Sequence, residues 1–185
     1  TFVGGGSGTS YPSAGMRAQT YNDDLVRRVG ELIGEDGLHS DISGIYGFGI
    51  NTHRTPYSGR NYEYYSEDPF VAGQETHREG VGTWSNEQAI REIYLNAFER
   101  VLRADKGGAK AIMTGFNRLG TTWNGMHSYI NNVLRGEFGF DGFTITDADS
   151  DNEGIICVSY MYAPRAVTTG TDMYDGMYNN HNRTG

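Results

Sequence analysis

The stretch GFDGFTITD, residues 139–147, decides the fold of this 185-residue chain. Residues 143–146 form a short run of apolar and β-branched side chains between a glycine and a polar cluster. Such a run predicts a buried strand of a parallel sheet. Asp147 then stands at the carboxyl end of the strand, where α/β folds collect their active-site residues. It is therefore a candidate catalyst, although an Asp after a strand also serves as a cap or turn residue.

Helix and strand patterns alternate around this strand. Upstream, apolar positions at helical spacing predict a helix over 85–102, which opens with a capping box from Ser85 to Gln88. Further elements are predicted as a strand at 109–114, a short helix at 128–135, a helix start at 164–169 and a short strand at 171–174. This alternation predicts right-handed βαβ units and a parallel sheet.

The first part of the chain is less regular. Asn22 caps a predicted helix that ends at Gly37. Residues 45–50 predict a glycine-interrupted strand with close backbone packing, and the polar stretch 51–68 follows it as a functional loop. Residues 1–10 form a glycine-rich segment without a Lys at Walker-A spacing, so a linker is favoured over a phosphate site.

Composition narrows the function classes. The net charge is −8 and the basic residues are scattered, which argues against nucleic-acid binding. Thirteen Tyr and 27 Gly suit either a carbohydrate-binding enzyme with loop-rich sites or an irregular soluble domain. No apolar run near 18 residues and no charged-then-apolar leader is visible, so neither a membrane span nor a signal peptide is predicted. A single cysteine excludes an intrachain disulfide and leaves the compartment open.

Several motifs, in chain order, resemble those of glycoside hydrolase family 3. N-T-H-R-T-P at 51–56 and G-R-N-Y-E-Y-Y-S-E-D-P at 59–69 are similar to the family signature N-I-x-R-x-P…G-R-N-x-E-x-x-S-E-D-P. Further blocks are Q-E-T-H-R at 74–78, R-E-I-Y-L at 91–95, L-R-G-E-F-G-F-D-G-F at 134–143 and G-T-D-M at 170–173. The resemblance covers about residues 11–174, and the order of so many blocks makes it specific.

The resemblance implies a (β/α)8 TIM-barrel domain paired with an α/β sandwich domain, and retaining hydrolysis of a β-linked oligosaccharide or glycoside without a cofactor. By resemblance, Asp147 matches the nucleophile, Arg60 and Arg78 match sugar-binding arginines, and Met113 and Phe116 line the pocket. The two apolar residues also suit a core. Arg60 also suits an ion pair with Glu63 or a later carboxylate of its loop.

The departures from the family pattern predict an α/β barrel that is incomplete in this chain. A full barrel needs roughly 250 residues. The family's K-H-F segment is missing between Gly73 and Gln74, where we expect an open sheet or a break, and the upstream D-G-P block is missing too. Ala148 replaces an aromatic residue of many members. The acid/base Glu is expected from the companion sandwich domain. Residues 1–10 suit a linker and also resemble a glycine-rich run of that domain, whereas residues 11–185 are expected to form the partial barrel.

Three functions remain open on the sequence. A β-glucosidase is favoured, with a non-catalytic sugar-binding fragment and a β-xylosidase as alternatives. His53 and His77 have no third ligand at metal spacing, so no metal site is predicted. Trp84 and Trp123 suit either stacking on a sugar ring or ordinary packing, and packing is favoured for both.

Overall fold

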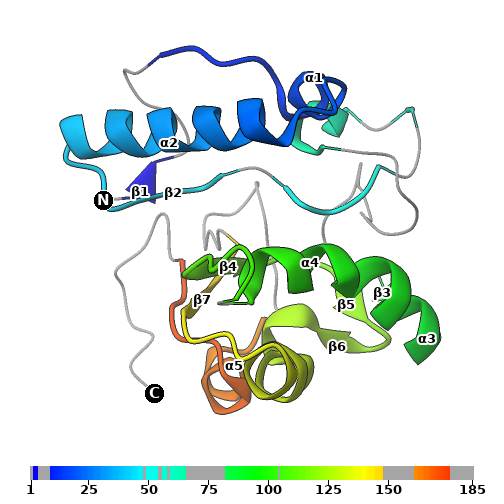
Figure 1. The fold of residues 1–185 in the computed structure, drawn as a ribbon. Helices are drawn as coiled ribbons and strands as arrows, with labels where there is room; N and C mark the ends of the chain where they lie inside the picture. Colours follow the sequence, from blue (N-terminus) through cyan, green and yellow to red (C-terminus); the bar gives the residue numbers. More distant parts are fainter. Residues whose placement is uncertain are drawn as a thin grey trace. The chain divides into compact units, whose positions relative to one another are not determined.

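The computed structural model describes residues 2–3, 9–47, 49–53, 56–57, 59–65, 82–103, 105–147 and 161–175 (Figure 1). The chain divides into two compact units, 1–72 and 73–185, and each is described by itself. The glycine run at 4–8, Arg54, the segment 66–81 and Ala148 lie outside the described residues. Predictions that fall on them stay predictions.

The first unit combines two short strands with two helices and a helical turn. Strand β1 (Phe2–Val3) pairs in parallel with β2 (Gly44–Ile45), so the start of the chain contributes to a sheet. Helix α1 (Ala14–Ala18) packs against the 3-10 turn η1 (Asn61–Glu63), and α2 (Asp23–His39) lies between α1 and β2 in the sequence.

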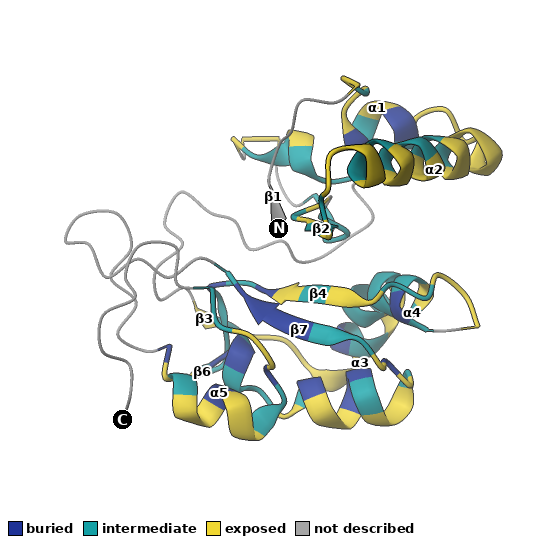
Figure 2. Cartoon of the chain, turned by 90° about the vertical axis from the view of Figure 1, so that its left-hand side faces the viewer, coloured by how far each residue is buried: buried dark blue, intermediate teal, exposed yellow. Residues whose placement is uncertain are grey.

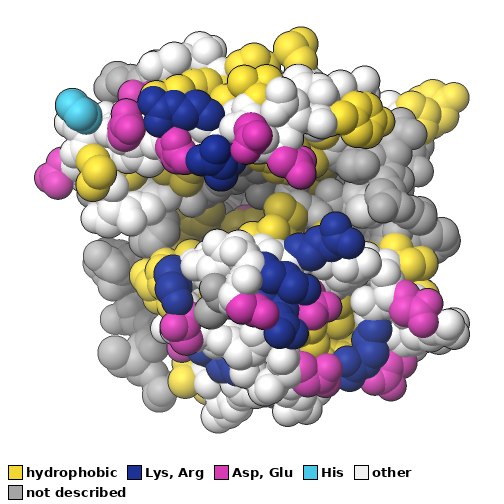
Figure 3. Space-filling model, in the orientation of Figure 1, with side chains coloured by type: hydrophobic (Ala, Val, Ile, Leu, Met, Phe, Trp, Pro, Cys, Tyr) yellow, Lys and Arg dark blue, Asp and Glu magenta, His cyan; other side chains and the backbone are white. Residues whose placement is uncertain are grey.

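Helix α2 begins where the sequence predicted and ends two residues later. The Asn22 side chain accepts a hydrogen bond from the Leu25 amide at 3.0 Å, which confirms the cap. The predicted end at Gly37 is wrong, because the left-handed backbone that ends the helix falls on Asp41 (φ 53°) instead. No residue of α2 is fully buried, and Figure 3 shows its basic and acidic side chains interspersed on the outer face.

The predicted strand at 45–50 is mostly wrong. Among the described residues of this stretch, only Gly44–Ile45 forms a strand, and Gly49 makes an isolated parallel bridge with Tyr64. The expected close backbone packing is confirmed at Gly49, since a Cβ there would lie 2.3 Å from the Tyr64 ring. The ring therefore takes the space that a regular strand's side chain would occupy.

The second unit contains the predicted βαβ arrangement. Strand β4 (Ala111–Thr114) pairs in parallel with β7 (Phe143–Thr146), and the π-helical η4 (Ile130–Glu137) lies between them in the chain. Helix α5 (Ala163–Thr169) follows β7 as predicted. The predicted strand at 171–174 is reduced to one parallel bridge, Ile145 with Met173, because the Asp172 side chain takes the neighbouring backbone donor of β7.

The long helix of this unit begins one residue later than the capping box implied. It comprises α3 (Glu87–Ala89), the π-helical η2 (Ile90–Tyr94) and α4 (Leu95–Leu102). The N-cap is Asn86, whose amide oxygen accepts from the Ala89 amide at 2.8 Å. The prediction of Ser85 as the cap is wrong because Asn86, an equally good capping residue, makes this hydrogen bond instead.

A hairpin that the sequence analysis did not predict follows β4. Strands β5 (Arg118–Leu119) and β6 (Thr122–Trp123) are antiparallel, and β3 (Gly82–Thr83) pairs in parallel with β5. Gly120 opens the two-residue turn with φ 61°, a conformation that suits glycine. The 3-10 turn η3 (Asn124–Met126) leads from the hairpin to η4.

Two clusters of buried side chains form the core of this unit, and Figure 2 shows β7 as its buried strand. One cluster contains Phe116, Trp123, Met161 and Ala166, and another contains Leu102, Leu134 and Phe140. Trp123 is 0% exposed, which confirms the packing role predicted for it. Trp84 is 78% exposed, so the same prediction is wrong for Trp84: its position beside the hairpin turn leaves most of the indole uncovered.

The fold is α/β, and no closed barrel is present among the described residues. Their sheets contain two, three and two strands. Nor does any described helix have the length and apolar character needed to cross a membrane.

Candidate active site

Asp147 lies where the sequence predicted, directly after the carboxyl end of the parallel strand β7. Its backbone amide donates to the Thr114 carbonyl at 2.9 Å, so the ends of β4 and β7 are joined at this residue. The residue is half-buried. Because carboxyl ends of parallel strands meet at one edge of a sheet, side chains that follow β4 and β7 share this edge.

The segment after α5 holds the end of β7 from its other side. The Thr146 amide donates to the Met173 carbonyl at 3.1 Å, and the Thr146 hydroxyl accepts from the Asp175 amide at 2.9 Å. Thr146 is 0% exposed, so these hydrogen bonds are shielded from water. The backbone immediately before Asp147 is thus bound on both edges.

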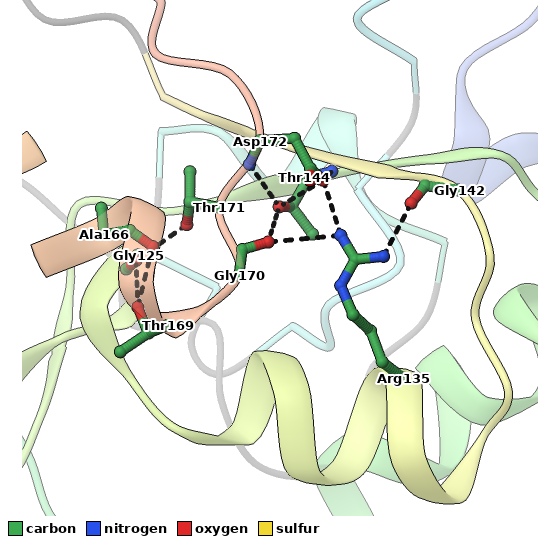
Figure 4. A network of polar contacts seen from close by, with 9 residues as sticks. All are labelled: Gly125, Arg135, Gly142, Thr144, Ala166, Thr169, Gly170, Thr171 and Asp172. Carbon is green, nitrogen blue, oxygen red and sulfur yellow. Dashed lines mark hydrogen bonds and ion pairs between the residues drawn. The ribbon is translucent and has the colours of Figure 1, made fainter. Parts of the chain in front are cut away.

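Asp172 anchors this segment to β7 through one carboxylate oxygen. Its Oδ2 accepts from the Thr144 amide at 2.7 Å, the Thr144 hydroxyl at 3.1 Å and Arg135 Nη2 at 2.6 Å. Figure 4 shows the Arg135 guanidinium reaching from η4 to this oxygen, and it also donates to the carbonyls of Gly142 at 3.1 Å and Gly170 at 3.2 Å. The family-like blocks 134–143 and 170–173 therefore meet at β7.

Two glycines make this close approach possible. A Cβ on Gly142 would lie 2.3 Å from the Lys110 carbonyl oxygen, and one on Gly170 would lie 2.3 Å from Asn131 Oδ1. Gly170 also has φ 107°, which favours glycine. Beside it, the Thr171 hydroxyl donates to the Gly125 carbonyl at 2.8 Å (Figure 4). Loss of either glycine would displace a strand or loop that borders Asp147.

Sequence reasoning did not select Arg135 or Asp172 as residues of this site. The sequence did contain a signal for both residues, because Arg135 lies in the motif L-R-G-E and Asp172 in the motif G-T-D-M. Their role is visible only in the structure, since Arg135 and Asp172 are 37 positions apart in the chain.

Arg60 makes the ion pair that the sequence offered as the alternative to sugar binding. Its Nε and Nη2 donate to the two carboxylate oxygens of Glu63, both at 2.6 Å. Arg60 belongs to the first unit and Asp147 to the second, so the sugar-binding role that the resemblance implies for Arg60 stays a prediction. Nearby, His53 Nε2 lies 2.7 Å from the Asn61 carbonyl oxygen.

The other predicted pocket residues are placed differently from one another. Met113, on β4, is 43% exposed, whereas Phe116 is 3% exposed in the core cluster with Trp123. The placement of Phe116 favours the core role of the two that the sequence left open. Arg78 lies outside the described residues. Among the residues that are described, no three His, Cys, Asp or Glu side chains gather in a metal-binding arrangement.

Comparisons with known proteins agree with the motifs. The model of the glycosyl hydrolase family 3 N-terminal domain matches residues 70–182. A β-glucosidase of Ruminococcus albus is 33% identical over 75% of this chain and 17% of its own length. An exo-α-(1→6)-L-arabinopyranosidase of Bifidobacterium longum is 34% identical over 78% of this chain and 22% of its own length.

Solved structures lead to the same family. β-Glucosidase 3B of Thermotoga neapolitana, in complex with glycerol, superposes with a TM-score of 0.77 at 30% identity, over 90% of this chain and 26% of that one. A β-glucosidase of Bifidobacterium adolescentis gives a TM-score of 0.78 at 25% identity. The chain thus spans only 17–30% of the length of these relatives.

The relatives also contain residues that this chain lacks inside the matched region. A β-glucosidase of Bacteroides ovatus matches over 199 residues but uses 93% of this chain, which is about 172 of 185 residues. About 27 positions of the match, 199 less 172, therefore have no counterpart here. This difference agrees with the expectation that internal family segments are missing.

Proposed function

Because the chain belongs to glycosyl hydrolase family 3, we propose that it forms part of a retaining β-glycosidase that hydrolyses terminal β-D-glucosyl residues. The observation that carries the proposal is the position of Asp147 at the carboxyl end of β7, inside the matched region 70–182. In α/β barrels this edge of the sheet carries the catalytic residues. Asp147 is the proposed nucleophile.

The proposed reaction has two steps. A carboxylate oxygen of Asp147 attacks the anomeric carbon, forming an ester bond while the bond to the leaving oxygen breaks and that oxygen receives a proton. Water then attacks the same carbon and releases Asp147. Retaining hydrolysis needs a second carboxyl group about 5–5.5 Å from the first to donate and later accept the proton. We assign that group to a companion α/β sandwich domain.

The bonds around β7 support a fixed nucleophile. Thr146 and Thr144 are fully buried and bonded to the segment 171–175, and Asp147 is tied to Thr114. These hydrogen bonds fix the backbone that carries the Asp147 side chain, and a preorganised catalytic group lowers the barrier to attack. The contacts thus support Asp147 as the proposed nucleophile.

Sugar binding is proposed for Arg60 and Arg78. The two-pronged ion pair with Glu63 holds the Arg60 guanidinium in one orientation, which suits recognition of neighbouring sugar hydroxyls. Sugar binding by Arg78 is proposed only because Arg78 ends the motif Q-E-T-H-R at 74–78. Met113, exposed near the end of β4, remains a proposed wall of the pocket.

A second candidate is a non-catalytic sugar-binding domain. The observation that favours it is the loss of about 27 matched positions relative to the Bacteroides ovatus protein, 199 less 172. The family's K-H-F segment is expected to be among the missing residues, and its Lys and His contact the sugar in family members. A chain without those contacts would bind sugar weakly and turn it over slowly.

The test is to incubate the chain with 2,4-dinitrophenyl 2-deoxy-2-fluoro-β-D-glucoside. Dinitrophenolate leaves without needing a proton, so the first step does not depend on the acid/base carboxyl group. We expect one fluoroglucosyl group per chain, located by peptide mass spectrometry on Asp147. Asp147→Asn should abolish labelling, whereas Asp141→Asn, at the opposite end of β7, should label normally.

Label on another carboxylate would remove Asp147 from the mechanism. Sugar binding without any label would favour the non-catalytic candidate. Repeating the reaction with the xylosyl and α-L-arabinopyranosyl analogues tests the glucosyl assignment, which fails if either of them labels Asp147 faster.

A further inference from the structure

A second concave site lies in the unit 73–185, between the start of the long helix and the β5–β6 hairpin. Its volume is about 320 Å³, within the range of sites for small ligands. It is lined by Trp84, Ser85, Glu87, Ile90, Leu119, Gly120, His127 and Tyr129. Neither Asp147 nor any other residue assigned to the candidate active site lines it.

The indole of Trp84 forms one wall, and hydrogen bonds between the strands beside it fix the backbone next to Trp84. The Thr83 hydroxyl donates to the Arg118 carbonyl at 2.7 Å, and the Gly120 amide donates to the Thr83 carbonyl at 2.8 Å. The six-membered ring of Trp84 rests on the hairpin turn, because a Cβ on Gly120 would lie 3.5 Å from its Cζ3. The side chain is nevertheless 78% exposed. A large aromatic surface thus lies beside the hairpin turn and is left open.

His127 and Tyr129 form another part of the lining as a stacked pair. Their ring centroids are 4.7 Å apart with an interplanar angle of 11°. The Tyr129 amide donates to His127 Nδ1 at 3.3 Å, which places the imidazole proton on Nε2. Burial lowers the pKa of His127, so the ring is neutral near pH 7. The site therefore combines aromatic surface with an uncharged N–H donor.

The remaining polar groups are a carboxylate and a hydroxyl. Glu87 accepts from Arg91 Nε at 2.9 Å, but Arg91 also pairs with Glu137, so the carboxylates outnumber the guanidinium and disfavour an anionic ligand. Ser85 adds a hydroxyl, and Ile90 and Leu119 supply apolar surface. A purely apolar ligand would leave the polar groups without partners.

We propose that this site binds the pyranose ring of a neutral carbohydrate. A β-glucopyranose presents C–H groups on its two faces and hydroxyl groups around its rim. The faces match the exposed indole, and the rim matches the hydroxyl, carboxylate and imidazole groups. The choice of sugar class rests on the proposed function, but binding here requires no chemistry at Asp147.

The chain's two tryptophans allow a direct test by NMR, with methyl β-D-glucopyranoside and cellobiose as probes. Each indole N–H gives its own signal, and the Trp84 signal is identified by its loss in Trp84→Phe. We expect both sugars to shift the Trp84 signal in a saturable way, with a Kd in the millimolar range. The signal of Trp123, which is 0% exposed, should stay in place.

Variants show whether the site itself binds. By direct observation of sugar signals, Trp84→Ala and His127→Ala should each weaken binding about tenfold or more. Tyr162→Ala, which alters another exposed aromatic residue of the same unit, should leave binding unchanged. Trp84→Tyr keeps an aromatic face and should retain part of the affinity, which separates loss of contact from loss of folding.

The result is independent of the labelling reaction at Asp147. Asp147→Asn should bind both sugars at Trp84 as the unmodified chain does, even if Asp147 proves not to be the nucleophile. A Trp84 signal that does not move at saturating sugar would overturn the inference. An equal shift with sorbitol, which has the hydroxyl groups but no ring, would also overturn it. A shift that phenol produces and neither sugar produces would do the same.

Discussion

Replacing Asp172 with alanine removes a shared hydrogen-bond acceptor at β7. Its Oδ2 accepts from the Thr144 amide at 2.7 Å and Arg135 Nη2 at 2.6 Å, and it shares the single Thr144 hydroxyl proton, at 3.1 Å, with the Gly170 carbonyl. Thr144 is 0% exposed, so water cannot replace the lost acceptor without entering the core. The Thr144 hydroxyl still donates to the Gly170 carbonyl at 2.8 Å, and its backbone amide becomes the principal unsatisfied group.

The expected loss of unfolding free energy is about 1–4 kcal/mol. A buried amide without a partner costs about 1–3 kcal/mol. The Arg135–Asp172 pair adds only up to about 1 kcal/mol, because the Asp172 side chain is 43% exposed and solvent screens the pair. Arg135 retains two carbonyl acceptors, at Gly142 and Gly170, and is not left uncompensated.

Urea denaturation, followed by the fluorescence of the buried Trp123, measures this loss. Asp141→Ala is the matched control, since it breaks the ion pair of Asp141 with Lys110, whose side chains are 66% and 62% exposed, and should cost less than about 1 kcal/mol. Asp172→Asn should fall between the two because its amide oxygen can still accept from Thr144. Equal losses for Asp172→Ala and Asp141→Ala would refute the reasoning.

Three smaller changes test other contacts of the same unit. Asn86→Ala should cost about 0.5–2 kcal/mol by removing the cap, and Ser85→Ala should cost almost nothing; the reverse order in a denaturation series would return the cap to Ser85. Gly170→Ala should lower the thermal midpoint measurably, because φ is 107° and the new methyl group meets a side-chain oxygen at 2.3 Å; an unchanged midpoint contradicts this. The hydrogen bonds from Arg91 lower the pKa of Glu137, so its stabilising charge persists above the ordinary Glu pKa and is lost as pH falls through the lowered value. Carboxyl NMR titration should give a higher Glu137 pKa in Arg91→Ala, and equal values would exclude this pair as the cause.

Local sequence patterns determined the elements that depend mainly on interactions between near neighbours in the chain. The apolar, β-branched run at 143–146 predicted β7, and Asn22 predicted the start of α2 through a hydrogen bond to Leu25, three residues away. The alternation of patterns likewise predicted the parallel β4–β7 pair. From this pairing and the position of Asp147 after the strand, the candidate catalyst could be named before its surroundings were known.

Where two residues suited one role, or one residue suited two roles, only the folded structure decided between them. Ser85 and Asn86 are both good caps, and the hydrogen bond to Ala89 selects Asn86. Phe116 suited a pocket or a core until its contact with Trp123 placed it in the core. Propensity ranks residue types but does not say which of two neighbours meets a partner.

Side-chain contacts between distant parts of the chain could not be predicted from the sequence pattern. Asp172 reaches Thr144 across 28 positions and Arg135 across 37, and no periodicity encodes either approach. The same holds for Trp84, whose exposed indole acquires a neighbour only when β3 pairs with the hairpin at Gly120. Sequence determined which side chains the strands and helices carry, whereas tertiary packing decided which of them meet, because hydrogen bonds and van der Waals contacts depend on distance in space.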